Sequence, residues 1–250
     1  MTESKIEDPR KQKIIKNKNE AMERVNSFLD SCIEGDKIHV KKADLLSYWL
    51  KDYINYLELE ETFNPVKLKK YKRGDVIKAN LGFNVGSEEG GLHYCVVIDN
   101  KNSQSHSTIT VIPLTSKIKE NNYSVFLGNE LYKNLISKAR NLLNSIDNEK
   151  VSSFEDKLGD FCNGNTDISI TDDEILAVQD SRFKLPLIEK IIDEIEQMKC
   201  GSMALVNQIT TISKQRIYNP KKNLDILSGI RISDENMDLI NKKIKRFFTY

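Results

Sequence analysis

The chain lacks the features that mark several classes of protein. It has no run of 18 apolar residues, so we expect no membrane span. Residues 1–24 are polar and contain no apolar core like that of a signal peptide. Five Pro and 11 Gly among 250 residues exclude a collagen-like or proline-rich linker protein. The four cysteines are far apart, with no CxxC pair, which favours reduced thiols in a cytoplasmic protein over a disulfide framework.

The chain also lacks a strong charge of either sign. Lys plus Arg number 38 and Asp plus Glu number 37, so the net charge is +1. A global basic field for nucleic acid is therefore absent, although a local patch remains possible. The segment Lys67–Arg73 holds five basic side chains in seven residues and one aromatic. Two interpretations stay open: these charges hold phosphates, or the segment is a solvated linker before the first strand.

Periodicity divides the chain into helical and β-rich parts. Helical spacing of apolar residues predicts helices over about 3–35 and 41–60, several helices within 129–200, and an amphipathic helix over 233–248. Thr171 and Glu174 form a capping-box pattern, Pro186 is expected to open a further helix, and Ser233 is expected to cap the last one. Short β-branched runs predict strands near 76–81, 95–98, 108–114 and 123–127, with a further β-rich segment at 203–217. The fold class is therefore α+β.

Metal and cofactor sites find little support in the sequence. None of the three histidines has another His or Cys three or four residues away, as a helical metal-ligand pattern would require. The glycine-rich segment Gly86–Gly91 lacks both the phosphate-loop and the dinucleotide-binding patterns. We therefore expect no metal and no cofactor. His93 follows this loop where a strand begins; taken alone it is a polar residue at a strand edge, although an imidazole can exchange a proton at neutral pH.

Five short segments in order resemble the MazF/PemK family of toxin endoribonucleases. Each is weak alone, but the order is fairly specific. The segments are Arg73–Val76, Gly86–Gly91, Val96–Asn100, Val111–Lys117 and Val206–Arg216.

This resemblance implies a fold and an activity. It implies a small SH3-like β-barrel with appended helices, which we place in residues 71–250 together with the C-terminal helix. The helical extension over 1–70 and much of the helical insertion at about 129–200 have no counterpart in a typical compact member of the family. The resemblance further implies a cytoplasmic homodimer that cleaves single-stranded RNA without metal and leaves 2′,3′-cyclic phosphate and 5′-hydroxyl ends. An antitoxin protein is the expected partner. A separate hypothesis is that the N-terminal helices either occupy the groove that an antitoxin would fill or enlarge the dimer contact.

The resemblance also implies the site residues. In the family the glycine-rich loop is followed by a catalytic Arg and a Pro, and this chain has His93 and Tyr94 there. The second catalytic residue, a Thr at the end of the third strand, is Thr115. An imidazole serves as acid or base more readily than a guanidinium. It lacks the permanent positive charge of Arg and the paired N–H donors that bind a phosphate through two hydrogen bonds. His93 and Thr115 are therefore the predicted catalytic pair, and a separate cation is still needed.

Substrate binding is expected from the remaining residues of these segments. The expected residues are Arg73, Ser87, Glu88, Ser116, Lys117, Gln208, Lys214 and Arg216. Four of them, Arg73, Lys117, Lys214 and Arg216, are candidates for the missing cation. The alternative function is a catalytically degenerate barrel that binds RNA or a protein without cutting.

Overall fold

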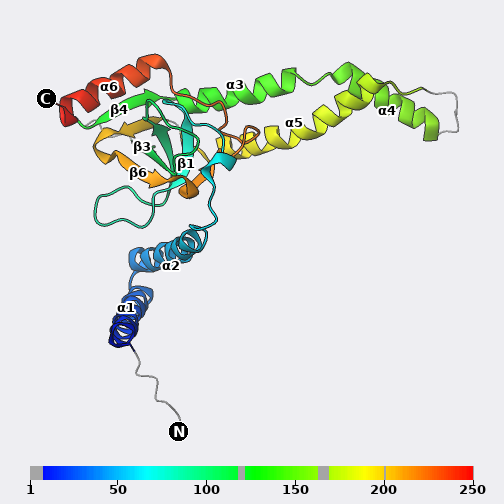
Figure 1. The fold of residues 1–250 in the computed structure, drawn as a ribbon. Helices are drawn as coiled ribbons and strands as arrows, with labels where there is room; N and C mark the ends of the chain where they lie inside the picture. The colour runs from blue at the N-terminus through cyan, green and yellow to red at the C-terminus, as the bar shows by residue number, and fades with distance from the viewer. Residues whose placement is uncertain (1–7, 118–121, 163–168, 200, 250) are drawn as a thin grey trace, which may run out of the picture. The chain divides into compact units, whose positions relative to one another are not determined.

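The computed structural model describes residues 8–117, 122–162, 169–199 and 201–249. The chain divides into two compact units, Met1–Glu60 and Glu61–Tyr250. Each unit is described by itself, and both are drawn in Figure 1.

The first unit is a pair of helices, as the apolar spacing predicts. Helix α1 spans Pro9–Ile33 and helix α2 spans Lys37–Glu58. The second helix begins four residues before the predicted start, because the Asp36 carboxylate accepts hydrogen bonds from the backbone N–H groups of Ile38 and His39, both at 3.0 Å. Such an N-cap satisfies donors that the first helical turn leaves unpaired.

The second unit is built on an antiparallel sheet of seven strands. The four strands predicted before residue 128 are confirmed, and the β-rich segment 203–217 forms three short strands. Their hydrogen-bonded order is β4-β5-β3-β2-β1-β7, and β6 pairs with β3 beside this path. The strands are β1 Val76–Asn80, β2 Leu92–Val97, β3 Thr108–Thr115, β4 Ser124–Gly128, β5 Ser202–Leu205, β6 Thr210–Ser213 and β7 Ile217–Asn219.

The expected closed barrel is not found among the described strands. The sheet ends at β4 and β7, and no ladder joins β6 to β7. These two strands are consecutive in the chain, but β6 pairs with β3 and β7 pairs with β1. The 3-10 turn Lys214–Arg216 connects them. A ladder between them would need a hairpin turn, whereas this turn carries the chain from its pairing with β3 to its pairing with β1.

The two faces of the sheet bury separate cores. One face, with Val96 and Leu114, packs against buried side chains of the helices that follow, including Leu135 and Ile191. The side chains of the other face contact one another and Tyr71 and form a second buried cluster. Its strand residues include Cys95, Val97, Val111, Ile212 and Ile217. Burial of apolar area at about 25 cal/mol per Å² makes these cores the main stabilising contribution. The alternation also fixes which side chains share a face at the ends of the strands.

The predicted helical insertion consists of three helices within 129–200. They are α3 Glu130–Asn144, α4 Asn148–Cys162 and α5 Asp172–Gln197. Helix α5 packs against both α3 and α4 (Figure 1). The predicted capping box is confirmed: the Thr171 hydroxyl accepts from the Glu174 N–H at 3.3 Å, and the Glu174 carboxylate accepts from the Thr171 N–H at 2.9 Å.

The prediction that Pro186 opens a separate helix is wrong. Pro186 lies inside the continuous helix α5. Proline removes one helical hydrogen bond and usually ends or kinks a helix. Here Ser181 precedes it and Ile188 and Ile191 follow it as buried residues of the same helix, so packing on both sides outweighs the single lost bond.

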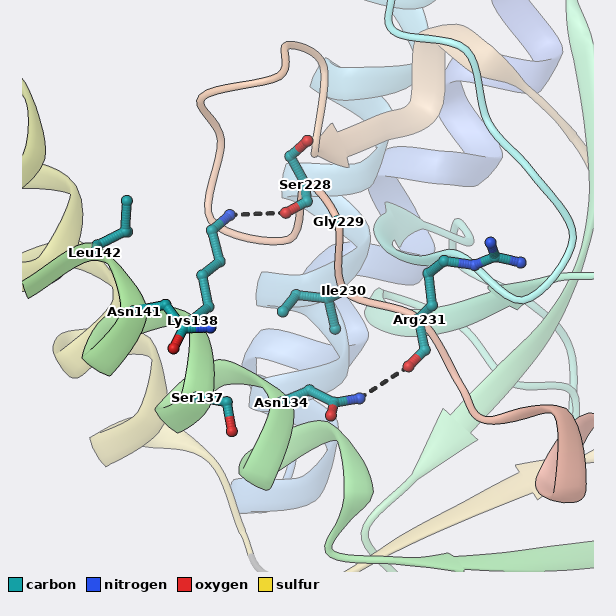
Figure 2. A pocket seen from close by; sticks show the side chains of 9 residues that line it. All are labelled: Asn134, Ser137, Lys138, Asn141, Leu142, Ser228, Gly229, Ile230 and Arg231. Atoms are coloured by element: carbon teal, nitrogen blue, oxygen red, sulfur yellow. Dashed lines mark hydrogen bonds between the residues drawn. The ribbon is translucent and has the colours of Figure 1, made fainter. Parts of the chain in front are cut away.

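Helix α3 is fastened to the segment that precedes the last helix, as Figure 2 shows. The ammonium of Lys138 donates to three carbonyl oxygens at 2.8 Å, and the Asn134 amide donates to the Arg231 carbonyl at 2.8 Å. Those three carbonyls belong to Asp225, Ile226 and Ser228. The contacts surround a cavity of about 470 Å³. Burial, with a contribution from Lys69, lowers the pKa of Lys138 to about 8.

The chain ends in the predicted amphipathic helix. Helix α6 spans Asp234–Phe248, and the Ser233 hydroxyl accepts from the Asn236 N–H at 3.4 Å at its N-terminus. Its apolar side adds Met237 and Ile240 to the larger core. Over the residues that the structure describes, no helix combines the length and apolar character needed to cross a membrane.

Candidate active site

His93 is the second residue of β2 and lies at the end of a buried face. It pairs with Ala79 of β1 and shares its face with Cys95. Its Nδ1 lies 3.2 Å from the Leu114 carbonyl oxygen, and its Nε2 lies 3.5 Å from a carboxylate oxygen of Glu89. A carbonyl can only accept, so Nδ1 carries the hydrogen of this contact, and Nε2 faces the Glu89 carboxylate. The side chain is 27% exposed.

Thr115 is the last residue of β3 and is half-buried. The β2–β3 ladder pairs Cys95 with Pro113, and His93 and Thr115 each lie two residues beyond this pair at the same end of the ladder. The Thr115 hydroxyl accepts from the Lys117 N–H at 3.2 Å, which leaves its own hydrogen available to donate. Residues two apart in a strand lie on the same face, so the two predicted catalytic residues share one face of the sheet.

The glycine-rich loop is held against the sheet by Gln208. The Gln208 carboxamide oxygen accepts from the Glu89 N–H at 3.3 Å, and its nitrogen donates to the Ser87 carbonyl at 3.1 Å. Within the loop the Glu88 carboxylate accepts from the Val85 N–H at 3.3 Å. The amide oxygen and nitrogen of Gln208 therefore both bind the loop, in which Glu89 lies beside His93.

Gly90 allows this loop to close tightly. A Cβ at this position would lie 2.6 Å from the Gly82 carbonyl oxygen, closer than two such atoms can approach. The Gly91 N–H donates to the same oxygen at 2.6 Å. The glycine is therefore required by a close backbone approach.

Arg216 lies at the same end of the strands as His93. Its Nε donates to the Asn80 carbonyl at 2.7 Å, and Asn80 pairs with Leu92, the neighbour of His93. Burial raises the pKa of the Cys95 thiol to about 12, and the positive charge of Arg216 opposes this shift. The guanidinium thus acts on the side of the sheet where His93 and Cys95 lie.

Two other candidate cations are bound elsewhere. Lys214 is 1% exposed, and its ammonium donates to the Ser103 carbonyl at 2.9 Å, while burial lowers its pKa. Arg73 is half-buried, and its guanidinium donates to the Ile98 carbonyl and to the Asn241 side chain. Lys214 holds the turn after β2, and Arg73 joins the residue after β2 to helix α6, so both act at the opposite end of β2. Ser116 and Lys117, in contrast, follow Thr115 and are exposed.

Glu89 and Asn80 were missed as site residues. Glu89 sits inside the glycine-rich segment, and its position four residues before His93 was the available signal. Asn80 contributes through a backbone carbonyl, which no side-chain pattern reveals. In the described part of the chain, no three His, Cys, Asp or Glu side chains gather in a group that could hold a metal ion.

One family of known proteins matches part of the chain. Residues 72–160 match the family of PemK-like, MazF-like toxins of type II toxin-antitoxin systems. This confirms the resemblance over a segment that includes the glycine-rich loop, His93 and Thr115. No curated protein matches the chain.

Proposed function

We propose that this chain is a toxin endoribonuclease that cleaves single-stranded RNA by attack of the 2′-hydroxyl, without a metal ion. The family match over residues 72–160 supports the reaction class, because its members are RNA-cleaving toxins. The observation that carries the proposal is the shared place of His93 and Thr115 at the ends of β2 and β3.

The proposed reaction uses His93 as a proton shuttle. Its Nε2 accepts the proton of the 2′-hydroxyl while the 2′-oxygen forms a bond to phosphorus. The bond from phosphorus to the 5′-oxygen breaks, and the imidazolium returns the proton to that oxygen. The products are a 2′,3′-cyclic phosphate and a 5′-hydroxyl. Glu89, 3.5 Å from Nε2, stabilises the imidazolium between the two transfers.

Thr115 and Arg216 are assigned to the phosphate. The Thr115 hydroxyl donates to a non-bridging oxygen, and the Arg216 guanidinium supplies the positive charge that an imidazole in place of the family Arg does not hold permanently. Exposed Ser116 and Lys117 extend the contact along the RNA. Ser87 and Glu88 in the glycine-rich loop contribute to the same surface, and Gln208 positions that loop.

The remaining parts of the proposal follow from the resemblance. We propose that the curled sheet is an SH3-like barrel that lacks one closing ladder, that the active form is a homodimer in the cytoplasm, and that an antitoxin protein covers the RNA site. Residues 1–70 are proposed as an extension added to this domain.

The test is cleavage of a mixed-sequence single-stranded RNA in EDTA, with the product ends mapped. Wild type is expected to give discrete cuts with cyclic-phosphate ends, and His93→Ala and Thr115→Ala are expected to give none. His93→Arg, which restores the residue of the family, is expected to keep activity. Full cleavage by His93→Ala would remove that residue from the mechanism.

The alternative is a degenerate site that binds RNA or a protein without cutting it. The observation that favours it is His93 in place of the catalytic Arg of the family. Intact RNA with antitoxin-free wild type at every pH from about 5 to 9, together with measurable binding, would establish it.

A further inference from the structure

A basic cavity lies at the other end of β2 from His93. Its volume is about 820 Å³, and it forms where the segment Lys70–Arg73 meets the turn Asn100–His106. None of its lining residues is acidic. His93 and Asn100 are seven residues apart along β2 and its continuation, so the two sites are separated by roughly 20 Å at about 3.3 Å per residue.

Three lysines of this cavity carry charge that the protein does not neutralise. Lys70, Lys72 and Lys101 are exposed, and no described carboxylate lies within ion-pair distance of their ammonium groups. Two nearby carboxylates are already engaged. Asp75 is 5% exposed and lies 3.6 Å from the Lys69 ammonium and 3.3 Å from the Arg231 guanidinium. Asp99 accepts from the Asn102 amide at 2.8 Å and from the Thr110 N–H at 3.0 Å. The three lysines therefore present a net positive surface to solvent.

The basic segment is fixed in an extended form that turns alternate side chains outward. The buried Tyr71 donates its hydroxyl hydrogen to the Pro220 carbonyl at 2.7 Å, and the Lys69 N–H donates to the Lys221 carbonyl at 2.8 Å. Lys69 and Tyr71 therefore face the protein, whereas Lys70 and Lys72 face the cavity.

The opposite wall of the cavity is fixed as well. The Gln104 amide donates to the carbonyls of Val66 and Leu68, at 2.9 and 2.6 Å, and so joins the turn to the chain before the basic segment. The buried Lys214 ammonium donates to the Ser103 carbonyl of the same turn at 2.9 Å. A surface held in this way loses little conformational entropy on binding.

We propose that this cavity binds the phosphate backbone of the RNA at a distance from the cleaved bond. Lysines are flexible point charges that suit successive phosphates of a chain rather than one planar group. The aromatic ring of the segment, Tyr71, is buried and offers no surface for base stacking, so the contact is independent of sequence. RNA as the ligand rests on the proposed function, whereas the basic surface does not.

The test is a comparison of two triple variants in the full-length chain. K70Q/K72Q/K101Q removes the three cavity charges, and K133Q/R140Q/K190Q removes three exposed charges from helices α3 and α5 as the matched control. Each is combined with His93→Ala so that RNA stays intact, and binding of a labelled 14-nucleotide RNA is measured by fluorescence anisotropy across salt concentrations.

The expected result is a loss of affinity specific to the cavity variant. Three phosphate contacts on a single strand contribute about 2 to the slope of log K against log salt, so this slope should fall by about 2 and affinity by about tenfold or more near 0.1 M salt. The control should change neither. An unchanged slope in the cavity variant, or an equal loss in the control, would overturn the proposal.

Two further experiments identify the ligand and distinguish failure of this proposal from failure of the proposed catalytic function. A 5′-nucleoside monophosphate or a poly-glutamate peptide that competes as well as RNA would overturn RNA as the occupant. With His93 intact, the cavity variant should raise KM for the 14-nucleotide RNA and leave cleavage of a trinucleotide pool unchanged, because a trinucleotide cannot reach both sites. If no RNA is cleaved, the binding arms still decide on the cavity.

Discussion

Gln208 binds the backbone N–H of Glu89 at 3.3 Å, although 119 residues separate the two in sequence. The contact joins the 3-10 turn after β5 to the glycine-rich loop before β2. Since the Glu89 carboxylate lies 3.5 Å from the His93 ring, one amide side chain holds in place the partner of the proposed proton shuttle. We therefore propose that Gln208 acts as a positioning residue, in place of the substrate contact expected from the sequence.

Removing this clamp should slow the reaction without unfolding the chain. We predict that Gln208→Ala lowers kcat by about 10- to 100-fold, as for other residues that orient a reacting group, with little change in Tm. Asn207→Ala, at the exposed neighbouring position, is the matched control. Single-turnover cleavage measures the effect. A Gln208→Ala enzyme with raised KM and normal kcat would instead assign the residue to RNA binding.

Glu89 should act through the charge of its carboxylate. Glu89→Gln keeps the shape of the side chain but removes the negative charge beside His93 Nε2. We predict a fall in kcat of about tenfold or more, because the imidazolium formed during the reaction loses its stabilising partner. Single-turnover cleavage measures the effect. Glu189→Gln, exposed on α5, is the control, and an unchanged rate in Glu89→Gln would exclude this role.

How far the sequence predicts the fold depends on whether the pattern is local. The capping box at Thr171 and the cap at Ser233 are read directly, because cap and helix lie within four residues. The prediction from Pro186 was wrong because the tendency of proline to end a helix was outweighed by the burial of Ile188 and Ile191. The missing ladder between β6 and β7 likewise depends on which distant strand each one joins.

The candidate site shows the same division. His93 and Thr115 were predicted from motifs, and the alternation along β2 and β3 sets both on one face of the sheet. The four candidate cations could not be separated by sequence, since the contacts of Lys214 and Arg73 are with residues far along the chain, in the turn after β2 and in helix α6. Glu89 was missed because its contact with His93 requires the fold of the loop.

Glu174 should make the helical insertion sensitive to acid. Its carboxylate accepts from the Lys157 ammonium at 2.8 and 2.9 Å, from the Thr171 N–H at 2.9 Å and from the Ser153 hydroxyl at 2.7 Å. These contacts, Lys157 first, lower its pKa to about 2. Because the folded form holds the proton more weakly than the unfolded chain, this stabilisation is complete above the ordinary carboxyl pKa of about 4.5.

The stabilisation should then be lost progressively as the pH falls from about 4.5 to about 2. We predict that Glu174→Gln lowers the protection of α4 and α5 in hydrogen exchange at pH 7, and that its difference from wild type shrinks through this pH range. Glu149→Gln, on the same hairpin, should match wild type at both ends of the range, because Glu149 makes none of these contacts. A difference between wild type and Glu174→Gln that stays constant from pH 7 to pH 2 would show that packing of the side chain, and not its charge, joins α4 to α5.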